Sequence, residues 1–427
     1  MNNPAHNANR NLLKLADNFL LKLKDGPLAI AVSGGSDSMA VLDLLIKANS
    51  QNRKLYCFTV DHQLRKEAKL EAQFVADFCS DHQITHQTLV WNGDKPTAGI
   101  QTAARWARYQ LLNNACQDVG AIGLVTAHNL DDQLETVFMR MQRDKTGEGI
   151  GLSGMAPTAL FYRSMWVFRP FLFVRKQQLK EHLLKSSIDW REDPSNVDEK
   201  FERVRVRQNA DLDFDLGDIK ANSQKRKNLS DAAAKYINQH CETSDGFVFH
   251  LTISDHQQRT LEKVLQVLAH VIGGRDRSLS RDDVISLYDF ATSDGDMRKT
   301  MGRVVLNKSG KQLQIYRENR GFENCHIDAG KSMKWDGRFL IHNLSENIGF
   351  ELKQNDDELG CPPIIRWQGD EEWSSPFDHA LVRIRPYINK YDQVLSEFDF
   401  QLANSIAQLL GRSEFLLPFD NAKEQIQ

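Results

Sequence analysis

The sequence contains no long apolar run and no closely spaced cysteines, and each absence excludes a class of protein. No stretch reaches the roughly 18 apolar residues that a membrane span needs, and 41% hydrophobic with 26% charged residues is the composition of a soluble globular chain. The six cysteines form no C-x-x-C pair, which argues against a zinc ribbon, an iron–sulfur site or a redox dithiol. The first residues lack the basic start and apolar stretch of a secretory signal, so we expect a cytoplasmic protein.

The sequence also lacks an excess of positive charge. Its 54 Lys and Arg residues stand against 57 Asp and Glu, which gives a formal net charge of -3. Nucleic-acid-binding proteins are usually basic overall, so the total does not indicate such a partner. The length of 427 residues predicts two or three domains.

The first half of the chain alternates short β-branched runs with longer amphipathic stretches. This repeated order predicts a mostly parallel, Rossmann-like α/β sheet with helices on both faces. Ligands of such sheets bind above the C-terminal ends of the strands. The expected strands are 28–32, 55–60, 86–90 and 122–127, and the expected helices are 39–48, 66–81, 100–116 and 131–143.

The pattern changes beyond residue 211. Residues 211–230 are rich in Asp, Lys, Asn and Ser and predict a polar linker, although part of it could be helical. A helix stopped by Gly273 and Gly274 follows, then a second helix after Ser280. Further expected elements are a β-hairpin of 303–306 and 312–316 around 307–310, and a terminal helix at about 391–410. We predict a catalytic domain at 1–215, a helical middle domain at 216–330 and a small α+β domain at 331–427.

Two glycines and three serines follow the first predicted strand, in the loop Ser33-Gly34-Gly35-Ser36-Asp37-Ser38. Glycines allow a tight turn with exposed N–H groups, the hydroxyls add donors, and a helix N-terminus adds positive potential. The loop therefore predicts a phosphate or pyrophosphate site. It is neither a Walker A loop, since Gly-Lys-Ser/Thr is missing, nor G-x-G-x-x-G. The alternative is a plain strand-to-helix turn in which Ser36 or Asp37 caps the helix.

Charged side chains follow the second predicted strand and lie on a later predicted helix. Asp61, His62 and Arg65 would face the same crevice as the loop, although Asp61 could equally just cap the next helix. Arg105 and Arg108 share one face of helix 100–116. Two guanidiniums suit phosphate contacts, whereas charge on a helix face is usually only solvated.

A polar cluster follows the fourth predicted strand. If the next helix starts near Asn129, Asp132 and Glu135 share one face and His128 lies close below them. Such a cluster could bind Mg²⁺, position an amine or act as a base. The alternative is a capping box with Asn129 as the cap. Both interpretations can hold together.

Taken together, these motifs resemble a known family. The loop is similar to that of the N-type ATP pyrophosphatases, or PP-loop proteins, and within them the chain resembles the tRNA(Ile)-lysidine synthetases. Two departures are an Asn at position 129, where the family commonly has a second histidine, and a longer segment at 142–149. The resemblance is strong over about 28–207 and rests on the loop and on residues 60–65 (VDHQLR), 104–109 (ARWARY), 126–136 (TAHNLDDQLET), 151–155 (GLSGM), 169–170 (RP) and 192–196 (EDPSN).

The resemblance implies a PP-loop ATPase fold and a two-step reaction. ATP would adenylate O2 of the wobble cytidine, position 34, in the CAU anticodon of tRNA(Ile). The ε-amine of free L-lysine would then displace AMP and give lysidine. Either a monomer or a homodimer is compatible with the sequence.

The resemblance also implies roles for the residues at the strand ends. Asp37 would bring Mg²⁺ to the phosphates, Asp132 and Glu135 would hold the lysine ammonium and remove its proton, and His128 and Arg108 would stabilise the adenylated intermediate. The implied ATP-binding set is Ser33, Gly34, Gly35, Ser36, Asp37, Ser38, Asp61, His62 and Arg65. The implied catalytic set is Asp37, Arg108, His128, Asp132 and Glu135.

A basic tract suggests a tRNA surface despite the near-neutral total. Arg203, Arg205 and Arg207 share one face of an extended segment, whereas in a helix only Arg203 and Arg207 do. Either arrangement could track an RNA backbone, and the alternative is an ordinary solvated basic face. Other basic residues of the tract are Arg163, Arg169, Arg175, Lys176 and 225–227.

Two other functions are weighed against this one. A PP-loop tRNA thiolase would need cysteine pairs or an iron–sulfur cluster, which the cysteine spacing does not provide. A catalytically degenerate tRNA-binding protein would have no need of the intact Asp37, Asp132 and Glu135.

Overall fold

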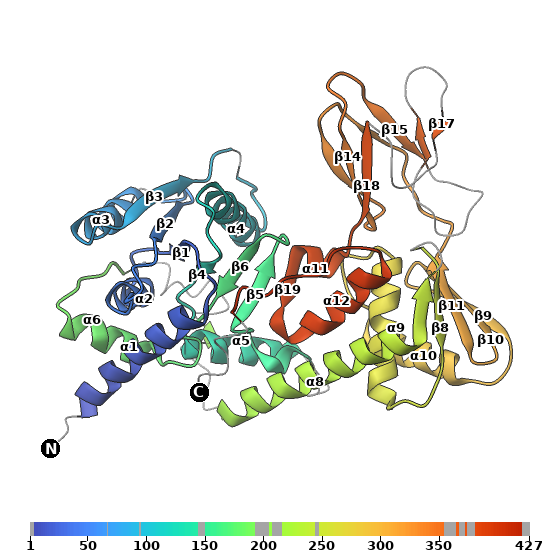
Figure 1. The fold of residues 1–427 in the computed structure, drawn as a ribbon, viewed down its shortest axis with the longest axis horizontal. Helices are drawn as coiled ribbons and strands as arrows, with labels where there is room; N and C mark the ends of the chain where they lie inside the picture. The colour runs from blue at the N-terminus through green and yellow to red at the C-terminus, as the bar shows by residue number, and fades with distance from the viewer. Residues whose placement is uncertain are drawn as a thin grey trace. The chain divides into compact units, whose positions relative to one another are not determined.

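The computed structural model describes residues 4–65, 67–93, 95–143, 150–192, 205–206, 216–243, 247–353, 364–366, 372–373 and 381–420. The chain divides into two compact units (Figure 1). The N-terminal unit comprises residues 1–224 together with 416–427, and the C-terminal unit comprises residues 225–415. The division into three domains remains a prediction.

A mostly parallel sheet forms the centre of the N-terminal unit, with the strand order β5-β6-β4-β1-β2-β3 within this unit. From β1 the chain adds β2 and β3 on one side and β4 on the other, and ligands of open α/β sheets bind at such a reversal. The parallel strands are β1 (Leu28–Ala31), β2 (Leu55–Asp61), β3 (Thr85–Val90), β4 (Leu124–Val125) and β6 (Met165–Phe168), and β5 (Thr158–Phe161) is antiparallel to β6.

Helices cover both faces of this sheet (Figure 1). One face carries α1 (Pro4–Lys22), α2 (Ser36–Lys47) and α6 (Lys176–Lys185), which pack on one another. The same face carries α3 (Ala68–Asp81), whose Phe74 contacts Arg191 after α6. Helix α4 (Ile100–Asp118) covers the other face. Helix α5 (Leu130–Arg143) follows β4. Strand β1 is apolar throughout, as expected of a strand covered on both faces. The predicted α/β class is confirmed.

Two predicted boundaries in this unit are wrong in ways that bear on the site. Helix α2 begins at Ser36 instead of residue 39, so the end of the predicted loop forms the first helical turn. Strand β4 spans only Leu124–Val125 instead of 122–127. Thr126 N still donates to Phe168 O of the neighbouring strand (2.9 Å), and the residues that follow it leave the sheet and can line a cavity.

For residues 211–230 the helical alternative is confirmed over the described part, and the linker prediction is not. Residues 211–215 lie outside the described residues, and the chain then forms the long helix α8 (Leu216–His240). The helical pattern is weak in the sequence because the buried face of the helix is partly polar. Ile219 and Ile237 are buried on this face, but so is Ser230.

The C-terminal unit begins with an antiparallel sheet and two helices, α9 (Gln258–Ile272) and α10 (Arg281–Thr292), as predicted. Ser280 and Asp283 form a capping box at the start of α10. The predicted hairpin exists but turns at 310–311, because residues 307–309 continue the strand. The strands, in sheet order, are β7 (Cys241–Thr243), β8 (Phe249–Thr252), β11 (Gln312–Arg317), β10 (Val304–Ser309) and β9 (Met297–Met301).

Two smaller antiparallel sheets follow and share a core around Trp335, Phe339 and Phe350. One contains β13 (Ser332–Trp335), β14 (Phe339–Asn343) and β18 (Val382–Pro386), and the other contains β12 (Cys325–Ile327), β15 (Phe350–Lys353), β16 (Ile364–Arg366) and β17 (Glu372–Trp373).

The continuous terminal helix predicted at 391–410 is wrong. The chain forms α11 (Asn389–Gln393), β19 (Val394–Ser396) and α12 (Phe400–Leu409) instead. The Ser396 hydroxyl accepts a hydrogen bond from Phe398 N, which starts a new turn and so separates the two helices.

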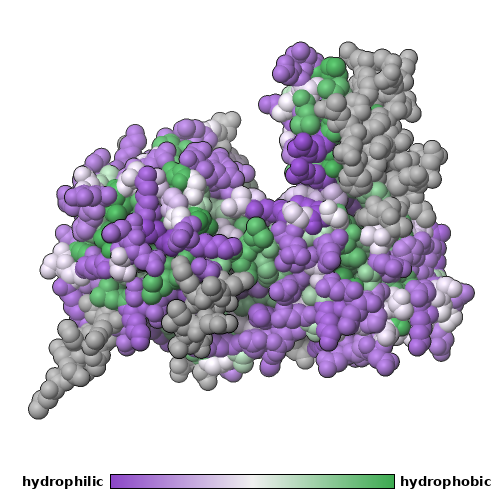
Figure 2. Space-filling model, in the orientation of Figure 1, coloured by the Kyte–Doolittle hydropathy of each residue, from purple (hydrophilic) through white to green (hydrophobic). Residues whose placement is uncertain are grey.

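Most of the surface visible in Figure 2 is polar on both units. Within the described residues, no helix is both long and apolar enough to cross a membrane.

A buried carboxylate, Asp399, joins α8 to the residues that precede α12. It accepts hydrogen bonds from Arg226 (2.6 Å) and Ser230 (2.7 Å), and Lys390 Nζ lies 3.9 Å away. Burial alone would raise the pKa of Asp399, but the positive charges of Lys390, Lys263 and Arg226 lower it far below its usual range. The charge of Asp399 is therefore part of the folded state.

We expect Asp399→Asn to destabilise α12 by about 3–5 kcal/mol, because buried cations would remain around a neutral amide. Hydrogen exchange of the Phe400–Leu409 amides measures this opening free energy. Asp231→Asn is the matched control: its carboxylate is partly exposed and pairs with Lys227 at 3.3 Å, so the change should stay below about 1 kcal/mol. Equal effects would contradict the role of Asp399.

Candidate active site

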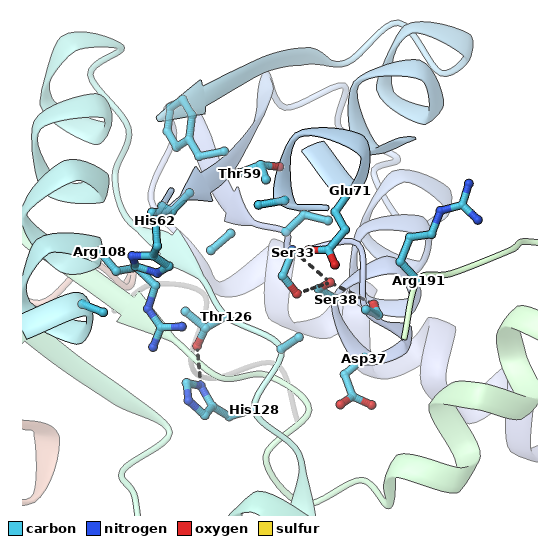
Figure 3. A pocket seen from close by; sticks show the side chains of 18 of the residues that line it. Ser33, Asp37, Ser38, Thr59, His62, Glu71, Arg108, Thr126, His128 and Arg191 are labelled. Carbon is cyan, nitrogen blue, oxygen red and sulfur yellow. Dashed lines mark hydrogen bonds between the residues drawn. The ribbon is translucent and has the colours of Figure 1, made fainter. Parts of the chain in front are cut away.

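A cavity of about 830 Å³ opens at the carboxyl ends of β1, β2 and β4, where the strand order reverses (Figure 3). The structure brings most of the predicted site residues onto its wall. These are Ser33, Gly35, Ser36, Asp37, Ser38, His62, Arg65, Arg108, His128 and Asp132. Gly34, Asp61 and Glu135 are not among the lining residues.

The loop after β1 is held in shape by its own hydroxyls. Ser38 Oγ accepts a hydrogen bond from Ser33 N (3.2 Å) and donates one to Gly35 O (2.9 Å). Gly34 has φ +84°, a conformation that favours glycine. Its carbonyl accepts a hydrogen bond from Arg191 N (2.8 Å), which ties the loop to the segment after α6.

The first turn of α2 points into the cavity without a side-chain cap. The N-cap is Gly35, and no side chain of the described residues makes a capping hydrogen bond there. The alternative in which Ser36 or Asp37 caps the helix is therefore wrong. The first amides of a helix have no intrahelical partner and carry partial positive charge, so this turn suits an anionic ligand.

Asp37 lies in that first turn and faces a cation from another helix. Lys176 Nζ lies 3.1 Å from Asp37 Oδ2, and Lys176 lines the same cavity. We predicted Lys176 only as part of the RNA tract. The local sequence does not indicate that Lys176 lies beside the loop, because the packing of two helices brings Lys176 and Asp37 together.

The residues after β2 divide into a turn former and two lining residues. Asp61 is buried and its Oδ1 accepts a hydrogen bond from Gln63 N (2.7 Å), so Asp61 shapes the turn instead of capping a helix. His62 and Arg65 line the cavity, and Arg65 Nη2 donates to Glu71 Oε2 (3.1 Å).

His62 is held in its neutral form. Burial, followed by repulsion from Arg108, lowers the pKa of His62, and the negative charge of Asp61 opposes this shift only in part. Its ring also packs edge-to-face against Trp91, with centroids 5.9 Å apart. A neutral imidazole on the wall can accept a hydrogen bond from a ligand.

Helix α4 contributes positive charge to the cavity. Arg105 and Arg108 both line it, and their guanidiniums lie 5.0 and 5.5 Å from the Tyr109 ring centroid. Burial would raise the pKa of Tyr109, but Arg105, Arg108 and Arg169 lower it. The lowered pKa reports a local excess of positive charge, which favours a phosphate-containing ligand.

Helix α5 begins with the capping box that we considered as the alternative. Asn129 N donates to Asp132 Oδ2 and Asp132 N donates to Asn129 Oδ1, both at 3.1 Å. Asp132 nevertheless lines the cavity, so capping does not exclude a chemical role. Glu135 shares the helix but is buried, with 1% of its surface exposed.

His128 lies just before this helix and is oriented by Thr126. Thr126 Oγ1 lies 2.9 Å from His128 Nδ1 and 3.3 Å from Phe168 O, so this hydroxyl fixes the orientation of the His128 ring against β6. In Figure 3 the His128 ring and the Arg108 guanidinium point into the same part of the cavity.

The 151–155 motif is packed against α5 by one amide side chain. Gln133 Oε1 accepts from Met155 N (2.6 Å) and Gln133 Nε2 donates to Met155 O (3.0 Å). Gly154 has φ +64°, and a Cβ at this position would lie 2.7 Å from the Gln133 amide. This glycine therefore cannot be replaced without displacing Gln133.

The predicted RNA tract is only partly at the surface. Arg205 is exposed, and Arg203 and Arg207 lie outside the described residues, as do 144–149 and 193–196. Arg169 is buried and donates to Ala156 O (2.8 Å), and Arg226 is paired with Asp399. Arg169 and Arg226 are therefore structural residues.

Comparison with known proteins gives matches to PP-loop proteins and to curated relatives of the whole chain. The family model described as "PP-loop domain" matches residues 4–210. The tRNA(Ile)-lysidine synthase of Rhizobium meliloti (strain 1021) is 33% identical, with 95% of this chain and 97% of that protein covered. The protein of the same name from Brucella anthropi is 31% identical over 94% and 97%. Among solved structures, the U34-tRNA thiolase NcsA from Methanococcus maripaludis is 16% identical with a TM-score of 0.39, covering 51% of this chain and 78% of that one.

We expect Gly154→Ala to destabilise the protein by about 2–3 kcal/mol, because strain at positive φ adds to the clash with the doubly hydrogen-bonded Gln133 amide. Gly120→Ala is the control, since Gly120 has φ +62° but nothing within 4 Å of an added Cβ. Its cost should be about 1 kcal/mol. The two unfolding free energies are compared by urea denaturation, and equal losses would show that the Gln133 contact is unimportant.

Proposed function

Since this chain belongs to the tRNA(Ile)-lysidine synthase family, we propose that it ligates lysine to C2 of the wobble cytidine, position 34, in the CAU anticodon of tRNA(Ile). ATP is converted to AMP and pyrophosphate. The observation that carries the proposal is the 33% identity over 95% of the chain. The cavity supports it, since the loop, Arg108, His128 and Asp132 line one space.

ATP occupies the cavity with its phosphates at the loop. The first turn of α2 offers backbone N–H groups and positive potential, and Arg105 and Arg108 add guanidiniums on the opposite wall. We propose that His62, which lines the cavity, accepts a hydrogen bond from the adenine amino group. A cavity of about 830 Å³ is in the size range of nucleotide sites.

Asp37 is the residue that would hold Mg²⁺. Mg²⁺ commonly takes one or two carboxylates together with substrate phosphates. Asp37 is a carboxylate on the cavity wall in the first turn after the loop. When bound, Mg²⁺ offsets the charge of the phosphates.

In the first step, O2 of the cytidine attacks the α-phosphorus of ATP. A bond forms between O2 and the α-phosphorus while the bond to the pyrophosphate oxygen breaks, and pyrophosphate leaves toward the loop. The Arg108 and His128 side chains point into one part of the cavity (Figure 3), and we propose that they stabilise the charge on the α-phosphate and on the adenylated base.

In the second step, the ε-amine of lysine attacks C2 of the cytidine and AMP leaves with O2. The amine must first lose a proton, and Asp132 is the carboxylate on the wall that can hold the ammonium and accept it. Glu135 lies one turn further along α5, in a buried position. We propose that Glu135 acts through Asp132 and does not contact the lysine directly.

The proposal also includes the residues that contact the tRNA and the cellular location of the reaction. Arg203, Arg205 and Arg207 would contact the tRNA backbone, and Arg205 is exposed as this requires. The reaction with tRNA and free lysine would take place in the cytoplasm.

The buried cysteines give no support to the thiolase alternative. Cys57, Cys79 and Cys116 are buried, and none of them lines the cavity. Burial also raises the pKa of Cys116 to about 12, so its thiol is not a nucleophile near neutral pH.

We expect incubation with ATP, lysine and tRNA(Ile) carrying CAU to add the mass of lysine, less water, to the wobble cytidine. Mass spectrometry of the digested tRNA detects the product. Without lysine, an AMP adduct of the tRNA should accumulate. A tRNA with another anticodon is the control, and absence of ATP consumption with every tRNA would refute the proposed function.

Asp132→Asn should lower the lysine-dependent step at least tenfold and leave adenylation nearly unchanged. An amide oxygen can still accept the Asn129 N–H of the capping box, so the helix start should lose only a few tenths of a kcal/mol. Single-turnover assays follow the AMP adduct and lysidine separately, and thermal unfolding tests the helix. An unchanged response to lysine concentration would refute the role of Asp132.

A further inference from the structure

Helices α2 and α6 contact each other at a constant spacing in sequence. Three polar side-chain pairs between α2 and either α6 or its C-cap, Ser186, are each separated by 139 residues, which means that the two helices run parallel. The pairs are Asp37–Lys176 at 3.1 Å, Asp43–His182 at 2.5 Å and Lys47–Ser186 at 3.0 Å. The first pair lies at the N-terminal turns of both helices, beside the cavity.

The middle pair fixes this register. The side chains of Asp43 and His182 are each 1% exposed. Burial alone would raise the pKa of Asp43, but hydrogen bonds from His182 and Lys47 lower it. A slip of α6 along α2 would leave the Asp43 carboxylate buried without these donors, which is costly. The position of Lys176 at the loop is therefore determined by the buried pair.

A second contact, with α5, holds the start of α6. Lys176 N donates to Asp131 Oδ2 (2.7 Å), and Arg175 Nη1 lies 3.6 Å from Asp131 Oδ1. Asp131 belongs to α5, the helix that presents Asp132. Lys176 is thus held between the loop and α5, although its side chain is 35% exposed and can move into the cavity.

We propose that Lys176 is an ATP-binding residue that neutralises Asp37 in the absence of nucleotide and contacts the ATP polyphosphate when nucleotide is bound. The inference rests on the proposed function of the cavity as an ATP site. A Walker A loop supplies a lysine to the β- and γ-phosphates from within the loop. The loop 33–38 contains no lysine. In this chain the ammonium comes from α6, whose docking on α2 places it at the same turn.

This arrangement also accounts for the charge of Asp37. Paired with Lys176, the carboxylate does not repel incoming phosphates. Once ATP and Mg²⁺ enter, Asp37 is needed for the metal, and the polyphosphate becomes the stronger partner of the Lys176 ammonium.

The test is isothermal titration calorimetry of the full chain with ATP in Mg²⁺ buffer, and with adenosine. Lys176→Met should weaken ATP binding about 10- to 100-fold, the range for a lost hydrogen bond to a charged group, and leave adenosine binding within twofold. Lys176→Arg should restore ATP binding to within a few-fold. If circular dichroism shows that the Met variant does not fold, the same titrations are carried out with Lys176→Gln.

Lys185→Met is the matched control, since Lys185 is exposed in the last turn of the same helix. It should change neither affinity. Unchanged ATP affinity in the Lys176 variants, or equal loss for ATP and adenosine, would overturn the inference. Wild-type chain that binds ATP but forms no lysidine would refute the proposed function and leave the assignment of Lys176 standing.

Discussion

The reversal of strand order at β1 is the constraint on which the site depends. Because β1 pairs in parallel with both β2 and β4, the segments that leave these three strands emerge at one edge and diverge around a gap. The tight turn at Gly34 and the early end of β4 keep backbone out of that gap. The polar residues that follow the strands therefore face a common space. The sheet topology alone brings them together, so no pattern that links distant parts of the sequence is needed to predict it.

Several residues of the site also stabilise the local fold. Ser38 closes the loop through its hydroxyl, Asp61 forms the turn that presents His62, and Asp132 forms half of a capping box. Capping and chemistry are therefore not competing explanations here. A carboxylate already fixed by backbone hydrogen bonds loses little further entropy when it binds a ligand, which is the advantage of a preorganised site.

The sequence predicts those parts of the structure that depend on neighbours in the chain. The β-α alternation, the loop and the stop at Gly273 are local patterns, and the expected sheet and helices follow from them. Helix α8 was predicted only as an alternative to a linker, because Ser230 is buried against Asp399, which lies 169 residues later. Lys176 was assigned to the surface for a similar reason, since its partner Asp37 lies 139 positions earlier and is reached only through the packing of two helices.

The position of charges, more than their sum, decides what this chain can bind. The net charge of -3 counts Arg169 and Arg226 equally with Arg205, yet the first two are buried in structural contacts. The fixed partners of Arg169 and Arg226 compensate for the cost of burying their charges, so these two residues contribute little to the electrostatic potential outside the protein. The cations that line the cavity, by contrast, remain partly exposed to solvent. Salt screens their charges at long range but not at contact distance, so they still attract an anionic ligand that enters the cavity. A nearly neutral protein can therefore present a strongly positive wall to ATP and to RNA.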